Sequence, residues 1–132
     1  PEYRTLYEEA VEASRASTAE GFFKRAIFEE SVGRYETAGR LYQRAADILP
    51  KATYLQRAAD SLTWSGDLAK AKEYATQAVQ IEPNSVEARL TLAQIYLTSK
   101  LKKNARREVD MALKIEPNNP DAKELLKKIK RG

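Results

Sequence analysis

The feature that most constrains the fold of this chain is a motif that recurs at a nearly constant interval. Three segments end alike, at residues 45–50, 78–83 and 112–117, and their final prolines lie 33 and then 34 residues apart. Small residues recur at fixed distances before each proline, at Ala38, Ala71 and Ala105. A period of this length is typical of repeat proteins, in which each unit buries its apolar face only by stacking on its neighbours.

Each unit divides into two predicted helices. Apolar residues with i, i+3, i+4, i+7 spacing mark the second helices, and a proline follows each one. Gly33 and Gly66 fall between the paired helices, where a left-handed residue is expected, and Lys100 takes the equivalent place in the third unit. The pattern predicts first helices over 20–32, 53–65 and 86–99, and second helices over 35–49, 68–81 and 102–115.

Further helices are expected at both ends of the chain. Residues 2–15 predict a flanking helix, and Tyr7 and Ala10 suggest that it is the second helix of a preceding half repeat. Ser17 and Glu20 have capping-box spacing, which predicts the start of a new helix at the first unit. Asn119 and Pro120 predict the start of a last helix, with an N-cap before a proline at the first helical position. The expected organisation is a flanking segment 1–18, repeats at 19–51, 52–85 and 86–119, and a capping helix at 120–132.

These units resemble the tetratricopeptide repeat (TPR) family, which has a 34-residue helix–turn–helix unit. Residues 52–85 carry its Gly66-Asp67 turn, the alanines Ala71 and Ala78, and the closing Pro83. The resemblance extends over all three units and implies an all-α fold, a right-handed superhelical solenoid of helix–turn–helix repeats.

Composition excludes most kinds of catalysis. The chain has no Cys and no His, so it lacks thiol chemistry, thiolate-bound metals and the commonest general base. It has no glycine-rich phosphate loop, and its adjacent carboxylates, such as Glu8 and Glu9, point apart on a helix. We expect no enzyme activity, no cofactor and no metal. The sequence contains no apolar run long enough for a membrane span and no secretory signal, so we expect a cytoplasmic location. The chain begins with Pro1, which suggests that it is a piece of a larger protein.

The resemblance also implies a function. In this family the first helices line a concave groove that holds an extended peptide or a partner helix, so we expect a non-catalytic scaffold or adaptor module. Alternative roles remain open for the apolar members: Phe23 and Ile27 under the flanking helix, Leu90 and Leu97 under the last helix, and Trp64 closing a turn. The expected partner-binding residues are Phe23, Ile27, Gln56, Arg57, Asp60, Trp64, Leu90, Gln94 and Leu97.

One ligand class of the family is not expected. Chaperone-binding members clamp a C-terminal carboxylate with Lys and Asn on successive first helices. The matching positions here hold one basic residue, Arg57, and one residue of the wrong sign, Glu87. The other matching positions are Phe23, Ile27 and Thr91.

Two alternatives to groove binding remain open, one from the charge distribution and one from the repeat architecture. The net charge is +4, and the basic residues are concentrated after residue 100. This end is expected to be a solvated face, an electrostatic site for an acidic partner, or, less expected, a nucleic-acid site. Self-association is the other alternative, because repeat arrays expose apolar surface at their ends. The basic patch consists of Lys102, Lys103, Arg106, Arg107, Lys127 and Lys128.

Overall fold

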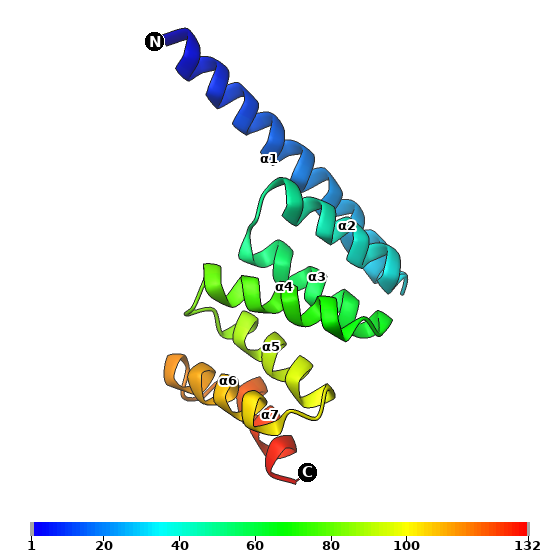
Figure 1. Ribbon diagram of the computed structural model, residues 1–132, viewed down its shortest axis with the longest axis vertical. Coiled ribbons are helices and arrows are strands. Elements are labelled where there is room, and N and C mark those ends of the chain that lie inside the picture. Colours follow the sequence, from blue (N-terminus) through cyan, green and yellow to red (C-terminus); the bar gives the residue numbers. More distant parts are fainter. Residues whose placement is uncertain (1, 132) are drawn as a thin grey trace.

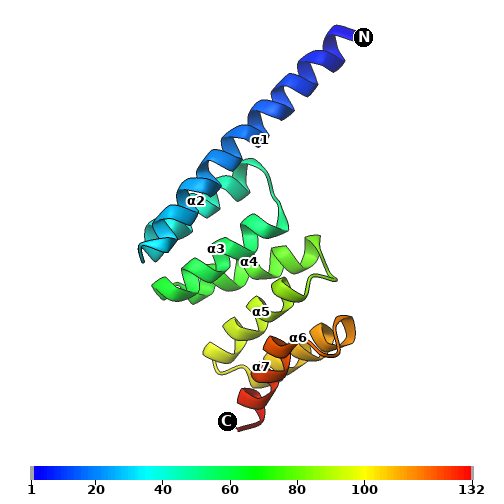
Figure 2. The ribbon, with the colours of Figure 1, turned by 180° about the vertical axis from the view of Figure 1, so that it is seen from behind.

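The computed structural model describes residues 2–131, with side chains from Thr5 onward, and all the regular structure in this range is helical. Figures 1 and 2 show the helices stacked in chain order, with the two termini at opposite ends of the stack. The expected all-α solenoid of helix–turn–helix units is thus confirmed. The helices are α1 (Glu2–Ser31), α2 (Tyr35–Ile48), α3 (Ala52–Ser65), α4 (Leu68–Ile81), α5 (Val86–Thr98), α6 (Lys102–Ile115) and α7 (Pro120–Arg131).

A left-handed residue closes the first helix of every unit, as the sequence predicted. Gly33 has φ +84° and Gly66 has φ +94°. Lys100, at the equivalent position of the third unit, adopts the same region with φ +64°. Glycine enters this region without steric cost, whereas a lysine side chain meets the following carbonyl oxygen.

Side chains cap three of the helices at their N-termini and satisfy backbone amides there. The predicted start of α7 is confirmed, because Asn119 Oδ1 accepts a hydrogen bond from the Ala122 amide at 2.9 Å. Asp67 caps α4 and Ser85 caps α5 in the same way, each bonding the amide three residues on at 3.2 Å.

The repeated alanines lie where the helices of a unit meet. Each is fully buried, so a larger side chain would hold the helix axes apart. Aromatic and aliphatic side chains fill the remaining space; Tyr42, Leu55 and Ile95 are among the largest that are completely buried. The core therefore runs as a series of layers along the stack. The alanines are Ala38, Ala45, Ala71, Ala78, Ala105 and Ala112.

A buried ion pair joins the two helices of the third unit. Arg89 on α5 donates to Glu108 on α6 at 2.9 Å, and their side chains are only 13% and 10% exposed. The Arg89 Nε also donates to the Pro83 carbonyl at 3.0 Å, so the same side chain fixes the turn before α5.

The predicted separate flanking helix is wrong. Residues 2–15 and the first helix of unit one form a single 30-residue helix, α1. Ser17 lies inside this helix and not at its N-terminus. No glycine or proline lies between Glu2 and Glu20, so nothing in the backbone stops helix propagation there. The boundary expected at residue 18 therefore falls inside one rigid element (Figure 1).

The N-terminal half of α1 extends beyond α2 and away from the stack (Figures 1 and 2). Arg15 donates a hydrogen bond to the Ile48 carbonyl of α2 at 3.1 Å, and Ala19 is the first buried residue of α1. The apolar side chains before this point are exposed, Leu6 by 64% and Tyr7 by 71%. This half consequently cannot cover Phe23 or Ile27, which was one expectation for those residues.

No helix within residues 2–131 combines the length and apolar character needed to cross a membrane.

Candidate functional site: the groove along α3, α5 and α7

Three adjoining hollows form a groove along the first helices of the units. Two lie between α3 and α5, with volumes of about 380 and 440 Å³, and share Asp60. The third, of about 230 Å³, lies between α5 and α7 and shares Gln94 and Lys128 with the second. The shared residues make the groove continuous from the beginning of α3 to α7, and its size suits a peptide segment.

Asp60 lies at the centre of the groove and links its two walls. Its carboxylate accepts hydrogen bonds from Thr91 on α5 and from Gln56 on α3, both at 3.2 Å. Burial raises the pKa of this carboxyl to about 6; the hydrogen bonds from Thr91 and Gln56 oppose the shift, Glu30 adds to it, and Arg57 opposes it. Because both bonded partners are neutral, no cation of the protein is hydrogen-bonded to the carboxylate, and in its charged form it keeps the capacity to attract one.

A second polar network fixes the wall of the groove next to α1. Glu30 accepts a hydrogen bond from the Tyr42 hydroxyl at 2.6 Å and an ion-pair contact from Arg57 Nη1 at 3.4 Å. Burial and the bond to Glu30 raise the pKa of Tyr42 well above its usual range, although the charge of Arg57 opposes this. Tyr42 therefore remains a donor, and Arg57 is held by a carboxylate of the protein itself.

Trp64 lines the 440 Å³ hollow at the end of α3 and is 73% exposed. Its ring stacks on Tyr35 of α2, with centroids 5.5 Å apart and planes 20° from parallel. The stack supports the indole from one side and leaves apolar surface open to solvent. An indole held in this way loses little conformational freedom when a ligand packs against it.

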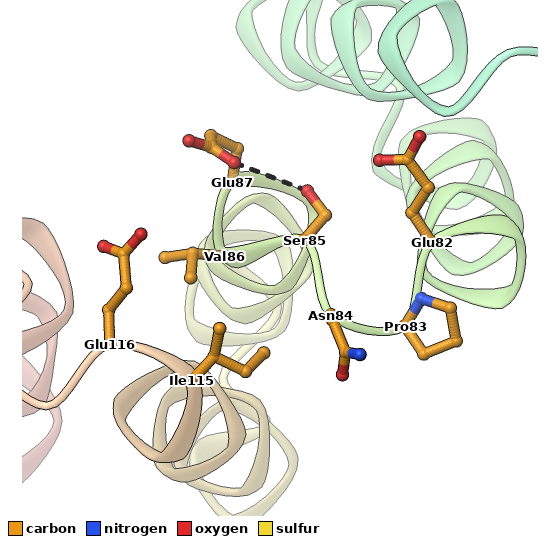
Figure 3. A pocket seen from close by; sticks show the side chains of 8 residues that line it. All are labelled: Glu82, Pro83, Asn84, Ser85, Val86, Glu87, Ile115 and Glu116. Carbon is orange, nitrogen blue, oxygen red and sulfur yellow. Dashed lines mark hydrogen bonds between the residues drawn. The ribbon is translucent and has the colours of Figure 1, made fainter.

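A fourth hollow, of about 460 Å³, adjoins the groove at the turn between α4 and α5. It shares Glu82, Ser85 and Glu87 with the hollow beside Asp60. Figure 3 shows the carboxylates of Glu82, Glu87 and Glu116 around it, with the apolar side chains of Val86 and Ile115 between them. None of the residues that line it is basic.

Six of the nine predicted partner-binding residues line the groove, and three do not. The ring of Phe23 packs against Tyr42 and Tyr54 at centroid distances of 5.5 and 4.8 Å, so it joins α1 to the core. Leu97 packs against the core cluster that contains α7 residues, and Ile27 is 39% exposed on α1 without lining any of the hollows. The six that line the groove are Gln56, Arg57, Asp60, Trp64, Leu90 and Gln94.

Leu90 lines the hollow beside α7 and also packs against the neighbouring core cluster.

Sequence reasoning missed the contribution of α7. Treated only as a cap, this helix was given no groove residues, yet it supplies Asp121, Glu124 and Lys128. The signal was present in the period: Lys128 follows Gln94 by 34 residues, as Gln94 follows Asp60. Helix α7 thus takes the place of the first helix of a fourth unit. Glu82 and Ser85 were missed because they lie on a turn rather than on a first helix.

The predicted basic patch is divided between two settings. Lys128 lines the groove and Lys127 lies exposed beside it in the sequence of α7. The four patch residues of α6 lie exposed on a second helix, where Arg106 pairs with Asp110 at 3.2 Å. Among the described side chains, no three His, Cys, Asp or Glu groups are placed to hold a metal ion together.

Solved structures of TPR domains have the same fold as this chain. The Arabidopsis OM64 TPR domain superposes with a TM-score of 0.83 at 21% identity, covering 89% of this chain and 98% of that one. The first TPR of Spaghetti (RPAP3), bound to the HSP90 peptide SRMEEVD, gives 0.83 at 20% identity, covering 88% and 93%. The second TPR domain of human RPAP3, in complex with the HSP70 peptide SGPTIEEVD, gives 0.81 at 21%, covering 91% and 98%. A search of curated protein sequences found no match.

Stacked helix pairs with a groove along their first helices define a helical-repeat solenoid. The tetratricopeptide repeat family profile matches residues 62–129, and the chain belongs to this family of protein–protein interaction modules.

Proposed function

We propose that this chain captures an extended peptide or a helix of a partner protein in the groove along α3, α5 and α7. The exposed indole of Trp64 is the observation that carries the proposal, because it stands in a hollow and is supported by Tyr35. A large apolar surface at such a place is typical of an interface anchor. Gln56, Asp60 and Gln94 offer the polar groups that fix the register of a bound chain.

The partner differs in this proposal from the chaperone tails of the related complexes. Those peptides end in Glu-Glu-Val-Asp. Here Arg57 is paired with Glu30, and Glu87 on the opposite wall would repel an acidic tail.

Selection from a random peptide library on the immobilised wild-type chain tests the proposal. Trp64 is the single tryptophan, so with peptides that lack Trp its fluorescence reports directly on the groove of the wild-type chain. Affinity for Trp64→Ala, which has no tryptophan, is measured by the fluorescence anisotropy of labelled peptides, with wild type measured in the same way. We expect Trp64→Ala to weaken selected peptides by about 2 kcal/mol, or ~30-fold in Kd. Leu101→Ala is the matched control, because Leu101 is 43% exposed at the turn between α5 and α6 and lines none of the hollows. Peptides that bind Trp64→Ala as well as wild type would contradict groove capture.

Self-association through α1 is a second candidate function. The outer face of α1 carries exposed apolar side chains at both ends, Leu6 and Tyr7 at one and Phe28 at the other. Between them lie small residues, and a Cβ at Gly21 would meet nothing within 4 Å. An antiparallel pair of α1 helices centred on residue 17 would place Leu6 of each copy opposite Phe28 of the other.

The same pairing brings opposite charges together, Glu9 of one copy beside Lys24 of the other, as a twofold interface requires. Sedimentation velocity over a range of concentrations checks this candidate. We expect a dimer for wild type and a monomer for the Tyr7→Glu, Phe28→Glu double variant. A wild type that remains monomeric at every concentration would exclude this second function while leaving groove capture intact.

A further inference from the structure

The groove is acidic although the chain is basic. The residues that line the three hollows and the adjoining fourth one include six carboxylates and two cations, whereas the whole chain has a net charge of +4. The charge is therefore segregated, and the surface outside the groove carries the excess of Lys and Arg. The six carboxylates are Asp60, Glu82, Glu87, Glu116, Asp121 and Glu124.

The two cations leave one end of the groove without compensation. Arg57 is paired with Glu30 at 3.4 Å, so its charge is already balanced by the protein. Lys128 lies on α7, in the hollows that contain Gln94, and not in those that contain Glu82 and Glu87. The end near the α4–α5 turn is consequently the most negative part of the groove.

The helix N-termini at this end do not reverse the sign. Thr53 and Glu87 lie in the first turns of α3 and α5, where each helix contributes about half a positive charge. Full negative charges on Glu82 and Glu87, with Asp60 deeper in, exceed these partial charges. A cationic ligand group is favoured here over an anionic one.

The other end of the part of the groove between α3 and α5 is apolar, because Trp64 lines it. Thr53 and Trp64 are separated along α3 by ~16 Å, from a rise of about 1.5 Å per residue. Extended chain spans this length in about five residues. Two side chains of one short peptide segment can thus reach both ends at once.

We propose that the occupant of the groove is an extended, positively charged segment of a partner protein, with a Lys or Arg side chain between Asp60, Glu82 and Glu87 and an apolar side chain, about five residues away, against Trp64. This inference rests on the proposed function, because it names the chemistry of the ligand that the same groove takes. Peptides with acidic ends, of the kind held in the related complexes, meet like charge at the same position.

The random-library selection described above supplies the probe. Selected peptides are synthesised, each with a partner peptide in which every Lys and Arg is replaced by Glu, and titrated against Trp64 fluorescence. We expect Lys and Arg to be enriched, and the charge-reversed partners to lose binding. The Glu82→Gln, Glu87→Gln variant should weaken the selected peptides roughly tenfold, and added salt should reduce its difference from wild type.

The Glu36→Gln, Glu73→Gln variant is the matched control, because both carboxylates are exposed on second helices and line none of the hollows. It removes the same net charge and should leave affinity within twofold of wild type, which separates local contact from the overall field. Equal losses in both variants would overturn the assignment of the cation to this end of the groove.

The outcomes distinguish the two proposals. Binders that depend on Trp64 but are neutral or acidic would overturn the charge inference and leave groove capture standing. A selection without any binder that depends on Trp64 would overturn groove capture, and the ligand chemistry with it.

Discussion

Thr91 donates a hydrogen bond from its hydroxyl to the Asp60 carboxylate at 3.2 Å, and this bond joins α5 to α3 in the middle of the groove. Thr91 itself is buried. The pair places a carboxylate between two units without any cation bonded to it, since the other donor is the Gln56 amide. A group in this position favours binding of a cation at the expense of folding stability.

Asp60→Asn should therefore stabilise the fold at neutral pH. The pKa of Asp60 rises from 3.8 to about 6, so its contribution to stability is full below pH 3.8 and is lost as the pH rises to about 6. We expect the variant to exceed wild type by about 1–3 kcal/mol above pH 6, with the difference vanishing below about pH 4. Urea unfolding at pH 4, 5 and 7 measures this. A difference that is the same at all three values would contradict the assignment.

The left-handed turn of the third unit offers a gain in stability. Lys100 has φ +64°, where the first two units have glycine. Lys100→Gly should raise the free energy of unfolding by about 1 kcal/mol, because glycine removes the steric strain of the Cβ. Gly66→Ala should lower it by a similar amount. Thermal unfolding of the two variants checks the pair, and a loss of stability in Lys100→Gly would refute this account of the turn.

The ion pair between α5 and α6 should be costly to break from one side. Glu108→Ala leaves the guanidinium of Arg89 largely buried without its carboxylate, and we expect a loss of about 3 kcal/mol. The exposed pair of Arg40 and Glu36 on α2 is the control, and Glu36→Ala should cost no more than about 0.5 kcal/mol. Chemical denaturation compares them. Similar losses in the two variants would show that burial of the Arg89 pair has no energetic consequence.

Ser61 provides a test of an unsatisfied polar group. Its hydroxyl oxygen is the one buried side-chain polar atom without a hydrogen-bond partner among the described residues. Ser61→Ala should stabilise the fold by about 1 kcal/mol, because the variant no longer buries an unbonded hydroxyl. Ser65→Ala is the control, since the Ser65 hydroxyl donates to the Leu62 carbonyl at 3.1 Å and should give no gain. Calorimetry that finds Ser61→Ala less stable would be evidence against this reading.

The sequence predicts most of this fold because the period and the turn residues are local signals. The alanines of the second helices and the glycines at residues 33 and 66 locate the units, and the observed helix ends agree within one residue for α2 to α7. The start of the first unit was misplaced because Ser17 has a good capping pattern, yet no helix-breaking residue precedes it. A serine within a continuous run of helix formers remains part of the helix.

The groove is harder to predict than the fold. Alignment of units identifies which positions face it, as for Asp60 and Gln94, but not whether a side chain there is already engaged. Phe23 is taken up by the rings of Tyr42 and Tyr54, and Arg57 by Glu30. These contacts join residues from different helices, so only the packed structure reveals them. Turn residues such as Glu82 were missed because the alignment of units marks only positions on the first helices.

The continuity of α1 has a mechanical consequence. With no joint between residues 2 and 31, the helix is a rod ~45 Å long, at about 1.5 Å per residue. Its most exposed apolar side chains, Leu6 and Tyr7, lie ~100–160° around the axis from Ala19 and Ala26, which pack against the stack. A partner bound to the free half of α1 is therefore held at a defined distance and orientation relative to the segment of α1 that packs on α2. Force applied to the free half is carried along one continuous helix to the segment that packs on α2.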